Sequence, residues 1–225
     1  MAEKIEYRIL GPLEVSVDGL VIEIGGRRLR ALLAILLLRA NEPVSRDALV
    51  DELWGEQPPP GAQHSLEVYI SRLRKVLGTV AGRPAVVTRP GAYCLRLADH
   101  QLDARRFEQL VREGRSSLAA GAPGPAGVTL RAALRLWRGQ ALADLSGEPF
   151  AQVEIRRLEE LRLGAAEDRI EADLALGRHA DLVSELEAMI AVNPLRERLQ
   201  GQLMVALYRS GRQAEVLEAY QAARR

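Results

Sequence analysis

Cysteine is almost absent from this 225-residue sequence, which contains only Cys94. A single cysteine cannot form a disulfide within the chain, and its scarcity fits a reducing compartment. The three histidines are scattered and lack a nearby cysteine, so no zinc site is expected. The longest apolar run, residues 31–38, is far too short to span a bilayer. With a charged N-terminus unlike a secretion signal, these features predict a cytoplasmic protein without a membrane partner.

The usual motifs of catalysis are missing as well. The sequence has no glycine-rich phosphate loop with its lysine and no Gly-x-Ser-x-Gly turn. We therefore predict that the chain is not an enzyme and binds no cofactor or metal. Aromatic residues make up only 4% of the sequence, so leucine, alanine and valine must build its hydrophobic cores.

The charge is unevenly distributed along the chain, although the net charge is only +1. Residues 60–98 carry six basic side chains and one acidic side chain, whereas residues 1–59 sum to −3 and residues 99–225 to −1. A local basic segment on a nearly neutral protein indicates a small nucleic-acid footprint.

The basic segment opens with a predicted helix from Pro60 to Gly78. Leucine and isoleucine recur at helical spacing and predict one buried stripe. The other faces carry His64, Glu67, Val68, Ser71, Arg72, Arg74 and Lys75. Basic side chains neutralise phosphates or read guanine, and small or apolar ones permit close approach to base edges, as a helix in a DNA major groove requires. Taken alone, this helix fits a solvated basic surface equally well.

The elements around this helix indicate a winged helix-turn-helix. Three short strands are predicted over residues 5–10, 13–17 and 20–24, with Asp18-Gly19 as a hairpin turn. Two helices follow, from Arg28 to Arg39 and from a Ser45 cap to Leu53. After the basic helix, strands over residues 85–88 and 92–97 flank a turn at Arg89-Pro90-Gly91. In this order of elements the third helix enters the major groove, and an arginine on the hairpin reaches the minor groove.

Four segments carry a resemblance to a known family: residues 10–13 (LGPL), 28–34 (RLRALLA), 49–55 (LVDELWG) and 69–75 (YISRLRK). They resemble the Streptomyces antibiotic regulatory proteins, or SARPs, and the match extends over nearly the whole chain. The resemblance implies an α+β fold with an N-terminal OmpR-type winged helix-turn-helix, over residues 1–98. An all-α, tetratricopeptide-like bacterial transcriptional activation domain is then expected over residues 99–225.

The residue pattern of the second half also predicts helix throughout, independently of the resemblance. We predict helices over 104–120, 128–138 and 150–176, a loop over 121–127, and two further helix pairs. Leu176-Gly177-Arg178-His179-Ala180 recurs as Ser210-Gly211-Arg212-Gln213-Ala214, with Pro194 between the units. The offset between the two copies equals the period of tetratricopeptide repeats, whose stacked helix pairs bury a shared core.

The resemblance assigns DNA-facing positions residue by residue. They are His64, Val68, Ser71, Arg72 and Arg74 on the third helix, Thr88 and Arg89 on the wing, and Trp54 beside the backbone; Lys75 joins them from the helix pattern. A surface ion pair is the alternative for Arg72 and Arg74. The alternative to DNA contact for Trp54 is that it caps the core, and Tyr69 suits either DNA contact or packing.

The implied function is promoter binding by head-to-tail pairs on direct repeats, with recruitment of RNA polymerase to antibiotic-biosynthesis genes. Glu52 and Glu56, beside the proline-rich loop of residues 54–60, are expected to contact the sigma subunit; ordinary solvated charges are the alternative. A tetratricopeptide adaptor with a protein-binding winged helix is a second possible function. Because SARP chains usually continue with further helix, the sequence is expected to be a piece of a longer regulator or to have a shortened last helix.

Overall fold

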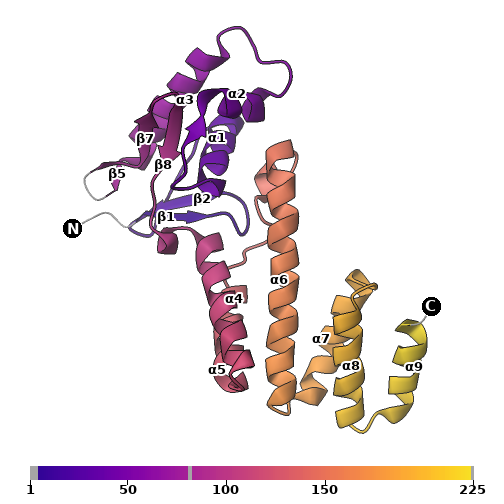
Figure 1. Cartoon of the computed structure of the whole chain (residues 1–225). Coiled ribbons are helices and arrows are strands. Elements are labelled where there is room, and N and C mark those ends of the chain that lie inside the picture. Colours follow the sequence, from indigo (N-terminus) through magenta and orange to yellow (C-terminus); the bar gives the residue numbers. More distant parts are fainter. Residues whose placement is uncertain (1–4, 81–82, 224–225) are drawn as a thin grey trace. The chain divides into compact units, whose positions relative to one another are not determined.

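The computed structural model describes residues 5–80 and 83–223 (Figure 1). The first four residues, part of the charged N-terminus, lie outside this range. Two compact units interleave along the sequence. The first takes residues up to Phe107 together with Leu136–Glu160, and the second takes Glu108–Arg135 and the residues from Leu161 onward. The predicted domain boundary after residue 98 stays a prediction.

The first unit begins with a three-stranded antiparallel sheet. The strands are β1 (Ile5–Arg8), β2 (Glu14–Val17) and β3 (Leu20–Ile22), paired in the order β1-β2-β3. Asp18 and Gly19 both have positive φ, at 50° and 83°, as a tight hairpin turn with the twist of its strands requires. The predicted hairpin turn is therefore confirmed.

Three helices and two further sheets complete the winged helix. The helices are α1 (Arg27–Leu38), α2 (Arg46–Trp54) and α3 (Ala62–Leu77), and the strands are β4 (Val44–Ser45), β5 (Thr79–Val80), β6 (Arg83–Pro84), β7 (Val86–Arg89) and β8 (Ala92–Leu95). The Ser45 hydroxyl accepts a hydrogen bond from the Ala48 backbone N–H, as its predicted capping role requires. Strand β8 lies between β4 and β7 in one sheet, and β5 pairs with β6 in the other. Sequence patterns missed the two-residue strands β4, β5 and β6, which are too short to show an alternating pattern.

The helical half contains η1 (Asp99–Gln101), α4 (Asp103–Ala119), α5 (Pro123–Leu134), η2 (Ala143–Leu145), α6 (Pro149–Ala175), α7 (His179–Val192), α8 (Glu197–Arg209) and α9 (Gln213–Ala223). The predicted fold class is thus confirmed: an OmpR-type winged helix-turn-helix precedes an all-α, tetratricopeptide-like region. None of the described helices is long and apolar enough to cross a membrane.

Three predictions for the helical half are wrong. The expected loop over residues 121–127 is mostly the start of α5, because Pro123 occupies its first turn, where a missing N–H costs nothing. The helix expected to end at Arg138 ends at Leu134. Beyond it, Trp137 packs edge-on against Phe107, with ring centroids 5.4 Å apart. Three helices, and not two pairs, follow α6 in the described residues, since the first repeat uses the end of α6 as its first helix.

The loop between β1 and β2 is held by residues that come much later in the chain. Asp103 accepts hydrogen bonds from the backbone N–H groups of Ile9 and Leu10, at 2.8 and 3.0 Å. Asp144 accepts one from the Leu13 N–H at 2.8 Å. A Cβ on Gly11 would lie 3.0 Å from the Cβ of Arg138, so glycine permits this close approach. Segment 136–160 is therefore part of the first unit.

Candidate nucleic-acid interface

Helix α3 has two distinct faces. Ala62, Leu66, Ile70, Leu73 and Leu77 are buried and fix the helix on the core of the first unit. The face directed away from this core carries exposed His64, Ser71, Arg72 and Lys75, with half-buried Val68 beside them. Gly61, at φ +80°, and Gly78, at φ +62°, bound the helix. The structure thus brings together on one face the residues that the sequence assigned to this helix, except Arg74.

Arg72 and Arg74 differ in their surroundings. Arg72 is exposed and has no hydrogen bond or ion pair among the described residues. Arg74 is half-buried and donates to the Val86 carbonyl from Nε at 3.0 Å and to the Thr88 hydroxyl from Nη2 at 2.6 Å. Arg74 therefore fastens β7 to α3, a role other than the surface ion pair weighed for it.

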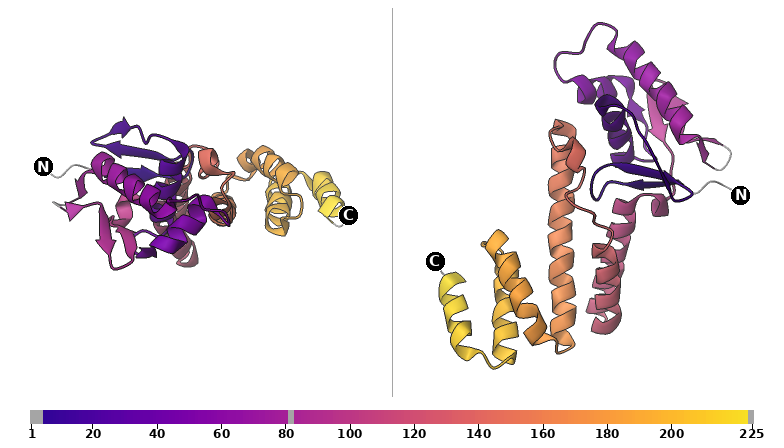
Figure 2. Two further views of the ribbon diagram at one scale, coloured as in Figure 1. Left: turned by 90° about the horizontal axis from the view of Figure 1, so that it is seen from above. Right: turned by 180° about the vertical axis from the view of Figure 1, so that it is seen from behind.

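The wing is the hairpin of β7 and β8 (Figures 1 and 2), and Pro90 and Gly91 form its turn. Arg89 is the last residue of β7 and pairs with Ala92, so it belongs to the strand and not to the turn as predicted. Gly91 adopts φ +66°, which glycine tolerates without strain. The Gly91 carbonyl accepts a hydrogen bond from the Arg46 N–H at 3.0 Å, which anchors the turn to the start of α2. Thr88 and Arg89 are both exposed.

Arg46 is a basic residue of this surface that sequence reasoning missed. Its guanidinium carbon lies 5.3 Å from the centre of the Tyr93 ring, and that of Arg74 lies 6.0 Å from the same ring. Arg46 also forms a 3.3 Å ion pair with Glu67, the acidic residue of α3. The pair reduces the effect of the one negative charge on this helix. Arg46 directly follows the Ser45 cap, at the first turn of α2, and this position was the sequence signal that could have identified it as part of the surface.

Trp54 joins α2 to α3. Its ring is stacked on that of Tyr69, with centroids 6.3 Å apart and planes inclined by 16°. The guanidinium carbon of Arg28 lies 6.0 Å from the Trp54 ring. Tyr69 thus has a packing role. Contact between Trp54 and the DNA backbone stays a prediction, because the Trp54 side chain is only half-buried.

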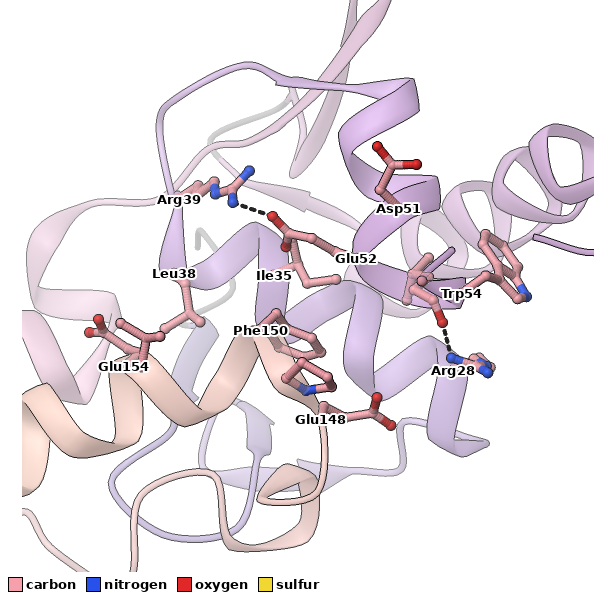
Figure 3. Close-up of a pocket in the computed structure, with 14 residues that line it drawn as sticks. Arg28, Ile35, Leu38, Arg39, Asp51, Glu52, Trp54, Glu148, Phe150 and Glu154 are labelled. Carbon is pink, nitrogen blue, oxygen red and sulfur yellow. Dashed lines mark hydrogen bonds and ion pairs between the residues drawn. The ribbon is translucent and has the colours of Figure 1, made fainter. Parts of the chain in front are cut away.

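A groove of about 820 Å³ lies beside Trp54, between α1, the end of α2 and the start of α6 (Figure 3). Glu52 lines it and forms an ion pair with Arg39, which also lines the groove. Glu56 lies outside the groove, in the exposed loop before α3. Of the two predicted polymerase contacts, Glu52 is therefore already neutralised and Glu56 is freely accessible to solvent.

Comparison with known proteins identifies both halves of the chain. The family model described as "Bacterial transcriptional activator domain" matches residues 102–225. The one described as "Transcriptional regulatory protein, C terminal" matches residues 24–95.

Individual relatives extend this similarity over the whole length. Regulatory protein AfsR of Streptomyces griseus is 42% identical over 224 residues, covering 100% of this chain and 22% of AfsR. Regulatory protein DnrI of Streptomyces peucetius is 40% identical over 222 residues, covering 96% of this chain and 82% of DnrI. A solved structure, "Mycobacterium tuberculosis EmbR in complex with low affinity phosphopeptide", has a TM-score of 0.95 and 38% identity, covering 98% of this chain and 59% of that one. The chain thus spans less than a quarter of AfsR and most of DnrI.

Proposed function

The chain belongs to the SARP family of bacterial transcription regulators, and from this premise we propose that it activates transcription from promoters that carry direct repeats. In this proposal α3 enters the major groove, and the hairpin of β7 and β8 contacts the adjacent minor groove. The regulated genes would be those of secondary metabolism, antibiotic biosynthesis among them. The relatives are transcriptional regulators, a non-enzymatic family, and the prediction that this chain is not an enzyme agrees with them.

The proposal that the chain binds DNA rests on the division of α3 into a buried stripe and a basic outer face. The stripe holds the helix backbone in place, which leaves Arg72 and Lys75 exposed. A guanidinium without an internal partner gives up no protein contact when it binds a phosphate or a guanine. Small Ser71 and half-buried Val68 between them permit close approach of a base pair.

Binding to direct repeats determines how two copies of the chain are oriented on the DNA. Two winged helices bound in the same orientation read the same half-site twice, whereas a two-fold pair would need a palindrome. We propose a head-to-tail pair on DNA for this reason. An operator reduced to one half-site should bind a single copy, and insertion of half a helical turn between the repeats should abolish paired binding. Two copies that bind both altered sites as tightly as the intact repeat would exclude this arrangement.

Recruitment of polymerase is assigned to the loop between α2 and α3, with Glu56 as its accessible carboxylate. Prolines 58–60 stiffen the loop, so contact with a basic sigma surface costs little ordering entropy. Glu52 contributes less, because contact with polymerase would have to compete with Arg39 for its carboxylate.

A purified transcription assay tests this contact. Glu56→Lys should leave operator binding intact and strongly reduce activated transcription, and the exposed Glu23→Lys serves as the matched charge-reversal control. Glu52→Lys alone would place a lysine beside Arg39 and destabilise the fold. The double exchange of Arg39→Glu with Glu52→Lys restores an ion pair, so it tests the polymerase contact of residue 52 without that destabilisation. Unchanged activation by the Glu56→Lys variant would place the polymerase contact elsewhere.

A further inference from the structure

Glu67 is the single acidic side chain of the basic segment, residues 60–98. It follows His64 by three residues and precedes Ser71 by four, so the three side chains lie along one side of α3. Its side chain is 51% exposed. DNA carries one negative charge per about 1.7 Å of its axis, and it repels a carboxylate that enters its groove. Glu67 therefore opposes DNA binding unless a cation or a hydrogen-bond donor faces it.

In the free chain the cation that faces Glu67 is Arg46, at the start of α2. Helices α2 and α3 and the strands β7 and β8 lie side by side (Figure 1). Arg46 donates from Nη1 to the Oε1 atom of Glu67 over a long distance of 3.3 Å. Both side chains are partly exposed, and an ion pair between such groups contributes little to stability. The pair can therefore open without disturbing the fold.

Arg46 is held in place without the help of Glu67. Its guanidinium carbon lies 5.3 Å from the centre of the Tyr93 ring, and its backbone N–H donates to the Gly91 carbonyl at 3.0 Å. Among the described residues, Glu67 is the only group that accepts from its guanidinium, and the buried Nε has no partner. A guanidinium has five N–H donors in a fixed fork that suits a phosphate. Tyr93 thus positions a cation that is prepared to bind an anion.

We propose that binding of the operator exchanges these partners: a DNA phosphate binds Arg46, and the released Glu67 carboxylate accepts a hydrogen bond from the N4 amino group of a cytosine. The exchange rests on the proposed entry of α3 into the major groove. Cytosine suits a carboxylate because its major-groove edge offers a donor alone. Adenine and guanine present the N7 acceptor and thymine presents the O4 acceptor, and each of these repels a carboxylate. Glu67 is thus a specificity-determining residue.

The same exchange discourages binding to unrelated DNA. Where no cytosine faces α3, the Glu67 carboxylate keeps Arg46 as its partner, and the phosphate contact of Arg46 is lost. Arg74 faces the same tyrosine ring, at 6.0 Å, but it cannot take this role. The Val86 carbonyl and the Thr88 hydroxyl already hold its guanidinium. Arg46 is therefore the basic residue whose phosphate contact depends on the base that Glu67 meets.

The base preference is tested by selection from a pool of random duplexes with the full 225-residue chain. Titrations on the selected duplex, with each base pair replaced in turn, then measure the preference at every position. The wild type should favour cytosine by about tenfold or more at one position of each repeat. Glu67→Gln should transfer this preference to adenine, because a carboxamide accepts from N6 and donates to N7. All other positions should keep their wild-type preference.

Glu23→Gln is the matched control, because Glu23 is exposed and lies outside α3. It removes the same charge and should keep the wild-type preference at every position. Thermal unfolding of both variants should match that of the wild type, since Glu67 is half exposed and its one ion pair is weak. A general effect of charge or folding would not change the preference at one position alone.

The exchange itself is tested by the salt dependence of binding. Arg46→Gln should lower the slope of the logarithm of affinity against the logarithm of salt concentration by about one on the selected duplex, and leave it unchanged on an unrelated duplex. Glu67→Gln frees Arg46, so it should bind the unrelated duplex more tightly, with a slope larger by about one. Combining it with Arg46→Gln should remove that increase in slope.

Two results would each overturn this inference alone. The first is a Glu67→Gln variant that binds DNA with the wild-type preference at every position. The second is an Arg46→Gln variant whose salt dependence on the selected duplex equals that of the wild type. A wild type that selects no duplex at all would instead overturn the proposed DNA binding, and this inference with it.

Discussion

Arg72 and Arg74 are neighbours on α3, yet they should respond differently to substitution. Arg72→Ala should weaken binding to the operator by about 1–3 kcal/mol if the side chain reads a base. It should leave thermal unfolding unchanged, because Arg72 has no hydrogen bond or ion pair among the described residues. Gel-shift titrations on operator and unrelated duplexes measure the first effect, and equal loss on both would mark a phosphate contact.

Arg74→Ala should lower both stability and DNA binding. The substitution removes the hydrogen bonds to the Val86 carbonyl and the Thr88 hydroxyl, each worth about 1 kcal/mol. The wing then loses its attachment to α3, so binding weakens through misplacement of Arg89 as well as through the lost charge. A variant with wild-type unfolding temperature would show that the two bonds contribute nothing to the fold.

Asp103 makes stability depend on pH in an unusual direction. Burial raises the pKa of Asp103 from 3.8 to about 6, although the Ile9 and Leu10 N–H groups and the charge of Arg138 oppose the shift. Between these values the folded state holds a proton that the unfolded state has lost. This group's contribution to stability therefore falls as the pH rises from about 4 to about 6.

Asp103→Asn should remove that dependence. The difference in unfolding free energy between wild type and variant should fall by up to about 1.4 kcal/mol per pH unit across the window and stay level above it. Denaturant titrations at a series of pH values measure it. Parallel curves for the two proteins would mean that Asp103 has an ordinary pKa in the folded state.

At the scale of the element, the wing should contribute preference for the DNA that flanks the repeat. Arg89 ends β7, and the following proline restricts it to extended geometry. Its exposed guanidinium suits a narrow minor groove, where the negative potential is strongest. Arg89→Ala should therefore lose more affinity on A·T-rich flanks than on G·C-rich flanks, with Arg96→Ala as a control on the same hairpin region. Equal losses on the two sets of flanks would reduce Arg89 to a general phosphate contact.

Helix α6 carries a buried acidic residue that holds its neighbours by ion pairs. The Asp173 carboxylate is 6% exposed and contacts Arg131 of α5, Arg169 of α6 and Arg178 before α7. Burial alone would raise the pKa of Asp173, but the hydrogen bonds and charges of Arg131 and Arg169 bring it below its ordinary value. Its contribution to stability is therefore present above the unfolded pKa and is lost as the pH falls through the folded one.

Asp173→Ala should destabilise the chain by about 1–3 kcal/mol, because buried Arg169 keeps only Glu185 as a partner among the described residues while the more exposed Arg131 and Arg178 turn to solvent. Chemical denaturation followed by circular dichroism measures the loss. The equivalent position in the second repeat is Leu207, so Leu207→Ala provides a comparison in which only packing is removed. A loss of less than about 1 kcal/mol in the Asp173→Ala variant would mean that solvent replaces the three arginines.

Sequence patterns predicted the elements whose signals are local. The Asp18-Gly19 turn, the Ser45 cap and the apolar stripe of α3 depend on residues within one turn or one helix, and the structure has all three. The roles of Arg74 and Glu52 depend on partners 12 and 13 residues away, in other elements. No spacing rule contains that information.

At the scale of the molecule, sequence patterns missed that residues 136–160 belong to the first unit, and the cause is again that their partners are distant in the sequence. Trp137 and Arg138 read as the end of a helix because their own segment is helical in pattern. Arg138 instead donates its backbone N–H to the Leu10 carbonyl, 2.7 Å away, and joins the first unit. Pairing between segments so distant in the sequence follows from the tertiary fold and not from local preference.

Selection from fragments of the source genome tests the central claim most directly. Immobilised wild-type chain should enrich promoter fragments that share a direct repeat, and Arg72→Ala combined with Arg89→Ala should lose that enrichment while remaining folded. Binding of the wild type to an enriched fragment should fall steeply and linearly on a logarithmic plot against salt concentration, because phosphate contacts release counterions. Failure of the wild type to enrich any duplex, at low salt as well as high, would contradict the assignment of α3 and the wing to DNA.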